Sequence, residues 1–226
     1  MTRKLLLMLL FTSLLMVGCQ TTPASDADSM AGKWQSLFNG ETLDGWLASE
    51  NQGTFTARNG MIVAHGPRSH LFYTGLVNGA NFKNFEFRAD VLTTPGSNSG
   101  IYFHTQYQKS GWPEKGFECQ INSTKHSDPK KTGGLYGVQD VMDNSPVPDD
   151  TWFHYYIRVE DTHVIIQIDG KTTTAWTQPE DWTPPEDMPG KEIDEGTIAL
   201  QGHDPDSVVY FKNIEIKVPP QPMDEF

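Results

Sequence analysis

Polar side chains that could bind a ligand and transfer protons alternate with apolar ones in three short stretches of the sequence. These stretches are Ser99–His104, Gly116–Asn122 and Ile198–His203. Successive side chains leave a β-strand on opposite faces, so the polar members of each stretch are expected on one face of a strand. They comprise Tyr102, His104, Glu118, Gln120, Asn122, Gln201 and His203. Amide, hydroxyl and aromatic groups suit sugar hydroxyls and ring faces, which favours a carbohydrate cleft over an ordinary solvated sheet face.

The acids in this polar set do not suit ordinary glycoside hydrolysis. That reaction needs two carboxylates flanking the bond, and the central stretch offers Glu118 with Gln120 where a second acid might stand. The set His104, Glu118 and His203 could bind a divalent metal ion. The histidines could equally bond a core neighbour or a sugar hydroxyl. The sequence therefore leaves the need for a metal cofactor open.

The elements that must position these residues are predicted to be strands. Apolar and polar residues alternate with period two between turns rich in Gly, Pro, Asn and Asp, and no segment has a clear helical period. The dipeptides Asn59-Gly60 and Asp169-Gly170 predict two tight hairpins, because both residue types accept positive φ. About a dozen short strands without intervening helices predict an all-β fold, an antiparallel sandwich or barrel.

One long stretch near the C-terminal part resists the strand pattern. Gln178–Gly190 contains four prolines, and each proline lacks the backbone donor that a sheet ladder needs. We expect an extended surface loop here.

The N-terminus has the layout of a bacterial lipoprotein signal. Two basic residues precede an apolar run over Leu5–Val17, and Gly18 stands directly before Cys19. Residues 1–18 are predicted to be the signal peptide and Cys19 the lipidated residue. Residues 19–32, polar and rich in small side chains, are predicted to be the lipidated cysteine and a flexible tether.

The remaining chain, residues 33–226, is predicted to be a single domain with an acidic surface. Cleavage would remove two of the 17 basic residues and none of the 29 acidic ones, which leaves a net charge of −14. Such a surface repels nucleic acid and anionic headgroups, so we expect no nucleic-acid partner and membrane attachment through the lipid alone. Gln20 after the modified cysteine favours an outer-membrane location, facing the periplasm or the exterior.

Six motifs in order resemble those of the 3-keto-disaccharide hydrolase family. They are Phe38–Trp46, Asn98–Phe103, Gly116–Ile121, Thr132–Gly137, Trp152–Gly170 and Gly196–Ile216. The similarity runs from about residue 34 to residue 218, with Asp204 where the family usually has Gly. The resemblance implies a concanavalin-like jelly-roll sandwich of two antiparallel sheets, with the sugar bound on the concave sheet.

The resemblance also implies cleavage of 3-keto-glycosides by elimination. A ketone at carbon 3 acidifies the hydrogen on carbon 2, so a base can remove it and form an enolate. The glycosidic oxygen then leaves carbon 1, and water adds to the unsaturated sugar. This route needs one base and one group that stabilises enolate charge, in agreement with the missing second carboxylate.

The resemblance and the polar face together suggest which residues act in catalysis and which bind the sugar. Glu118 or His104 is the expected base, and His203 or a divalent ion would stabilise the enolate oxygen. The expected sugar-binding residues are Asn98, Tyr102, Gln120, Tyr136, Gln201 and Trp46. Trp46 could stack on a sugar ring or belong to the core. A non-catalytic, lectin-like binding module and a scaffold lipoprotein remain as alternatives to the enzyme.

Overall fold

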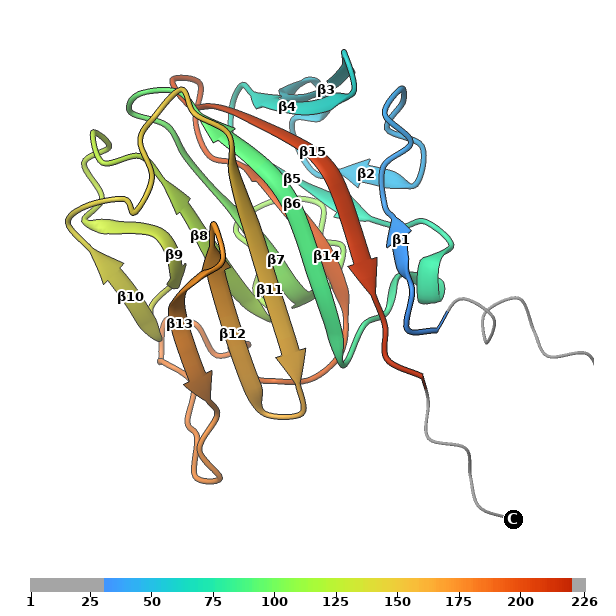
Figure 1. Cartoon of the computed structure of the whole chain (residues 1–226), viewed down its shortest axis with the longest axis vertical. Coiled ribbons are helices and arrows are strands. Elements are labelled where there is room, and N and C mark those ends of the chain that lie inside the picture. The colour runs from blue at the N-terminus through green and yellow to red at the C-terminus, as the bar shows by residue number, and fades with distance from the viewer. Residues whose placement is uncertain (1–30, 221–226) are drawn as a thin grey trace, which may run out of the picture.

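The computed structural model describes residues 31–220, which form two antiparallel sheets packed face to face (Figure 1). One sheet consists of β1 (Trp34–Ser36), β3 (Phe55–Arg58), β4 (Met61–His65), β6 (Phe85–Thr93), β11 (Phe153–Glu160), β12 (His163–Ile168), β13 (Lys171–Thr177) and β15 (Val208–Lys217). The other consists of β2 (Trp46–Ala48), β5 (Ser69–Tyr73), β7 (Asn98–Thr105), β8 (Phe117–Asn122), β9 (Lys130–Leu135), β10 (Gln139–Met142) and β14 (Thr197–Gly202). The short 3₁₀ turns η1 (Gln52–Thr54) and η2 (Val77–Ala80) are the only helical segments among the described residues.

The strand order within each sheet confirms the all-β sandwich predicted from the sequence. The eight-stranded sheet runs β13-β12-β11-β6-β15-β4-β3, with β1 paired to β15. The seven-stranded sheet runs β10-β9-β8-β7-β14-β5-β2. Neighbours in both orders are often distant in sequence, which is typical of a jelly roll.

Alternating burial shows where the core lies. In β6, buried residues alternate with half-buried ones along the whole strand, because one face meets the core and the other meets solvent. In β7, β8 and β14 every residue is buried. Their apolar side chains fill the space between the sheets, while loops cover the polar side chains on the opposite face.

Both predicted hairpins are present. Asn59 and Gly60 connect β3 to β4 with φ values of 52° and 76°, and Asp169 and Gly170 connect β12 to β13 with φ values of 49° and 75°. Two successive residues with positive φ match the twist of a tight hairpin.

The predicted export features are outside the part of the chain that the structure describes. The signal peptide 1–18, the lipidated Cys19 and nearly all of the tether 19–32 precede residue 31, so they remain predictions. Within residues 31–220, no helix is long and apolar enough to cross a membrane.

Two histidines are buried in the fold as neutral side chains. His104 Nε2 lies 2.8 Å from the carbonyl oxygen of Lys83, and the amide of Asp194 donates to Nδ1 (3.2 Å). A carbonyl only accepts, so the ring proton belongs on Nε2. Burial lowers the pKa of His104 to about 4 and that of His70 to about 3.

We expect the free energy of unfolding to fall as the pH drops from about 6.5 towards 4. The unfolded chain binds protons at His70 and His104 in this range and the folded chain does not, so stability rises with pH. Each histidine should remove about 2 kcal/mol at pH 5. Urea denaturation at pH 7.5 and pH 5 measures this loss, which should be smaller for His70→Phe than for the wild type.

The exposed His163 provides the control. His163→Gln should keep the full pH dependence of the wild type. If His70→Phe also kept it, burial of a neutral His70 would not be the source of the acid sensitivity.

Candidate functional site

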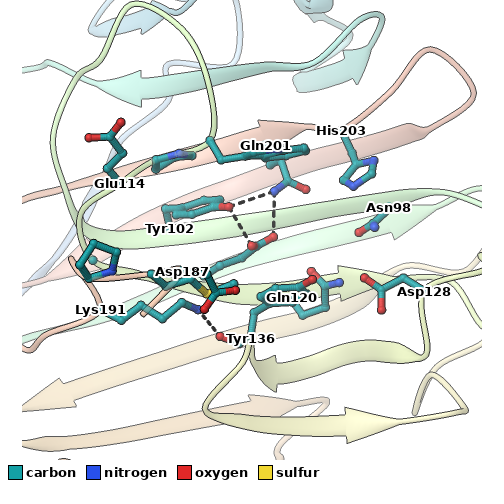
Figure 2. Close-up of a pocket in the computed structure, with 16 residues that line it drawn as sticks. Asn98, Tyr102, Glu114, Gln120, Asp128, Tyr136, Asp187, Lys191, Gln201 and His203 are labelled. Carbon is teal, nitrogen blue, oxygen red and sulfur yellow. Dashed lines mark hydrogen bonds between the residues drawn. The ribbon is translucent and has the colours of Figure 1, made fainter. Parts of the chain in front are cut away.

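A pocket with a volume of about 560 Å³ opens on the face of the seven-stranded sheet that points away from the core (Figure 2). Its floor consists of side chains from β7, β8 and β14, namely Asn98, Tyr102, Glu118, Gln120 and Gln201. Its walls include Trp112, Glu114, Asp128, Tyr136, Asp187, Met188, Lys191 and His203, which lie on the connecting segments. The floor thus joins strands that are far apart in the sequence.

The carboxylate of Glu118 is the centre of a hydrogen-bond network on the floor. The Tyr102 hydroxyl donates to Oε2 (2.7 Å), and the Gln201 amide donates to Oε1 (2.8 Å). Gln201 also donates to the Tyr102 hydroxyl at 3.2 Å. With its nitrogen facing Glu118, the Gln120 amide donates to Oε1 at 3.2 Å. These donors hold the carboxylate in one orientation.

Strand register explains why these side chains meet. Tyr102 lies directly opposite Glu118 in the pairing of β7 with β8. In the pairing of β14 with β7, Ala199 lies opposite Tyr102, so Gln201 follows two positions along on the same face. The alternation read from the sequence predicted this common face correctly.

The environment of Glu118 favours its protonated form more than water does. Only 8% of the residue is exposed, and this burial raises the pKa of its carboxyl. The Tyr102 hydrogen bond and the positive charge of Lys191 oppose part of that rise. Burial also raises the pKa of Tyr102 well above its usual value, so the phenol stays a donor.

Lys191 is a pocket residue that sequence reasoning missed. It follows the predicted loop Gln178–Gly190, which the structure confirms as a segment without strands. Its Nζ donates to the Tyr136 carbonyl, and the Trp182 indole donates to the Lys191 carbonyl at 2.7 Å. Burial lowers the pKa of Lys191, while the charge of Glu118 raises it. Trp182, an aromatic residue inside a proline-rich loop, was the one signal that this loop packs inwards.

Asp128 and Trp112 also line the pocket and were not predicted. Asp128 lies on the loop after β8, and the buried Lys131 holds this loop by donating to the carbonyls of Ser123 (3.0 Å), His126 (2.8 Å) and Asp128 (2.6 Å). Trp112 lies between a Gly and a Pro in a loop, a place where an exposed aromatic residue could have suggested a ligand contact.

The structure corrects the placement of His104. The sequence pattern put it on the same face as Tyr102, but His104 has φ of 53°, and the register between β7 and β14 shifts beside it. Such a bulge turns a side chain out of the regular alternation. The ring packs against Phe85 and Phe103 and does not line the pocket. His104 therefore lacks the position that a base for this pocket requires.

Trp46 is a core residue. It is 7% exposed, its indole donates to the Leu37 carbonyl at 2.7 Å, and its ring contacts Tyr73 edge to face. Of the two roles predicted for Trp46, the core role is confirmed, and stacking on a sugar in the pocket is wrong.

The predicted metal set is not assembled either, because His104 lies outside the pocket that contains Glu118 and His203.

A different group, His126, His203 and Asp204, brings one ligand atom from each residue within 4.8 Å of the others. Most of its donor atoms are already engaged, however, and only the Nε2 atoms of the two histidines lack a hydrogen-bond partner among residues 31–220. Oδ1 of Asp204 accepts from two backbone amides, and Oδ2 accepts from the Ser207 hydroxyl (2.9 Å) and lies 2.7 Å from His203 Nδ1. His126 Nδ1 accepts from a backbone amide as well. The group therefore offers two free ligand atoms, fewer than the three protein ligands that a catalytic zinc site uses.

The other predicted site residues line the pocket. They are Asn98, Tyr102, Glu118, Gln120, Tyr136, Gln201 and His203. Their contact with a sugar remains a prediction.

Solved structures share the fold of this chain. Two putative glycosyl hydrolases of Parabacteroides distasonis are each 24% identical to it. The first has a TM-score of 0.71 and covers 87% of this chain and 97% of its own. The second has a TM-score of 0.65, with 82% and 99% covered. The carbohydrate binding module CBM66 of Bacillus subtilis, 12% identical, has a TM-score of 0.53 and covers 79% of this chain and 97% of its own.

No curated protein sequence matches this chain. A family does: the 3-keto-alpha-glucoside-1,2-lyase-like domain matches residues 33–217. That range includes every residue of the pocket, and the family and the sheet-borne cleft both indicate a carbohydrate-active protein. This chain belongs to the family of 3-keto-alpha-glucoside-1,2-lyase-like domains.

Proposed function

We propose that this protein cleaves the glycosidic bond of 3-keto-glycosides by elimination followed by hydration, with Glu118 as the base. One observation carries the proposal. Of the four carboxylates that line the pocket, which are Glu114, Glu118, Asp128 and Asp187, Glu118 alone is buried. A buried carboxylate with a raised pKa is a stronger base than an exposed one, and the reaction needs one base at carbon 2.

The elimination follows from the acidity of the keto-sugar. Glu118 takes the proton from carbon 2, and the C–H electrons form the enolate whose negative charge is on the carbon 3 oxygen. The enolate then reforms the ketone, a double bond forms between carbons 1 and 2, and the glycosidic oxygen leaves with its bonding electrons. Addition of water across that double bond gives the free 3-keto-sugar.

Lys191 is the group best suited to stabilise the enolate. Its ammonium lines the same pocket and is close enough to lower the pKa of Glu118. A fixed positive charge in a partly desolvated pocket stabilises developing negative charge more than water does. Asn98, Gln120 and Tyr136 offer the amide and hydroxyl groups that sugar hydroxyls need.

We expect chromogenic 3-keto-glucosides to be cleaved and their unoxidised parents to be left intact. Glu118→Gln should lower kcat on the keto substrate by about 10²–10⁴-fold, because it removes the base and keeps the shape. Absorbance of the released chromophore measures both the preference for the keto substrate and the loss of kcat. Glu114→Gln, an exposed wall position, serves as the matched control and should stay within a few-fold of the wild type.

Two outcomes would contradict the proposal. Cleavage of the unoxidised parent at a similar rate would show that the ketone is not needed. Sugar-dependent thermal stabilisation without turnover of any glycoside would identify a binding module instead.

The rate should also depend on pH through Glu118. We expect kcat/KM to increase with pH as Glu118 loses its proton, with a midpoint above 4.5 because burial raises its pKa. Lys191→Met removes a positive charge that lowers this pKa, so its midpoint should lie at higher pH than that of the wild type. Identical pH profiles for the two proteins would show that Lys191 does not act on the base.

Gly100 makes room for the base. A Cβ at this position would lie 2.5 Å from Glu118 Oε1 and 2.9 Å from Cγ. Gly100→Ala should therefore displace the carboxylate and lower kcat by about tenfold or more, since a misplaced base loses its alignment. Gly53→Ala, where a Cβ would meet nothing within 4 Å, is the control and should keep activity. Full activity of Gly100→Ala with a normal melting temperature would contradict the assigned position of the base.

A further inference from the structure

A histidine and an aspartate form a hydrogen-bonded pair at the edge of the pocket. His203 and Asp204 follow β14 directly, and His203 Nδ1 lies 2.7 Å from Asp204 Oδ2. Figure 2 shows His203 beside Asn98 and on the far side of Gln201 from Glu114. His203 lines the pocket that contains Glu118, and the proximity of the two residues is enough for His203 to lower the pKa of Glu118.

Asp204 is held rigidly in place. Its Oδ1 accepts from the amides of Asp206 (2.9 Å) and Ser207 (3.0 Å), and its Oδ2 accepts from the Ser207 hydroxyl (2.9 Å). A carboxylate only accepts, so the 2.7 Å contact places a proton on His203 Nδ1. The hydrogen bond at one ring nitrogen decides the role of the other. It leaves Nε2, which has no hydrogen-bond partner within residues 31–220, free for a substrate or water.

The elimination and the hydration leave two proton transfers without a residue. Glu118 acts at carbon 2, yet the departing glycosidic oxygen must gain a proton and the incoming water must lose one. Both events take place at the oxygen bound to carbon 1, so a single group at that position can serve both. The pocket offers a histidine at a different edge from Lys191, as Figure 2 shows.

We propose that His203 is the acid and base at the glycosidic oxygen and that Asp204 is the positioning residue that holds its ring. This inference rests on the proposed function. Protonated His203 gives its Nε2 proton to the leaving oxygen while Glu118 takes the proton from carbon 2. Neutral His203 then takes a proton from water as the water oxygen bonds to carbon 1. Glu118 returns its proton to carbon 2, and both residues are back in their starting states.

Asp204 supports this cycle in two ways. Its Oδ2 accepts the Nδ1 proton and so sets the tautomer of the ring, and its own hydrogen bonds hold the ring in one orientation, as the aspartate of a catalytic triad does for its histidine. The ring of Trp112 also contacts His203, with centroids 5.2 Å apart, and packs against one side of the imidazole.

The test compares two 3-keto-glucosides that differ in their leaving group. A 4-nitrophenolate leaves without help from an acid, whereas the alkoxide of a second sugar needs a proton. His203→Gln should lower kcat on a 3-keto-disaccharide by about 10²–10⁴-fold and on the 4-nitrophenyl compound by less than about tenfold. Asp204→Asn should reproduce this difference in weaker form. His154→Gln, which breaks a similar pair with Asp90 outside the pocket (3.1 Å), is the matched control.

A second readout follows the hydration step. With the 4-nitrophenyl substrate, His203→Gln should release nitrophenol and accumulate the unsaturated keto-sugar, which NMR of the reaction detects. Equal losses on both substrates, or no accumulation, would overturn the proposal. Loss of wild-type activity with a chelator and its return with a divalent ion would also overturn it, because His203 would then act on a metal. If the wild type cleaved no 3-keto-glycoside at all, the proposed function would fail before this assignment is reached.

Discussion

The site depends on the burial of one carboxylate, that of Glu118, on the polar face of a sheet. A buried charge is unfavourable unless it is hydrogen-bonded or paired. Here Tyr102 and Gln201 donate to the two oxygens, and Lys191 supplies a nearby positive charge. These partners come from β7, β14 and the segment after the proline-rich loop. A slip of one residue in the register of β7 or β14 would turn its donor into the core and leave the carboxylate without compensation.

The two sheets differ in how their faces are covered, and only the seven-stranded sheet carries the pocket. The eight-stranded sheet has one face in the core and one in solvent, which its alternating burial shows. The seven-stranded sheet is covered on both faces in its middle strands, because loops pack over its polar side. Buried donors hold these loops: Lys131 binds three carbonyls of one loop, and Trp182 binds the carbonyl of Lys191 in another. The pocket walls are therefore parts of the fold and not loose additions to it.

Groups with different chemical properties line different sides of the pocket. Glu118 lies on the floor, where the absent side chain of Gly100 gives it space. Lys191 approaches from one wall and the His203–Asp204 pair from another. A base, a positive charge and a second proton-transfer group suit a reaction in which protons move at carbon 2 and at the oxygen bound to carbon 1. Ordinary glycoside hydrolysis asks instead for two carboxylates across one bond.

The strands and their faces could be predicted from the sequence, because a two-residue period places alternate side chains on opposite sides whatever the partner strand is. That rule was enough to place Tyr102, Glu118, Gln120 and Gln201 on one face, and the pairing of β7 with β8 and β14 brings them together. It failed at His104, where a positive φ and a register shift with β14 are set by pairing with a strand about 90 residues away. Lys191 and Asp128 were also out of reach, because strand periodicity does not tell how an irregular segment folds back over a sheet. Lys191 binds the distant carbonyl of Tyr136, and the buried Lys131 holds the loop of Asp128. The charges that surround the buried carboxylate therefore follow from the packing of these segments in three dimensions.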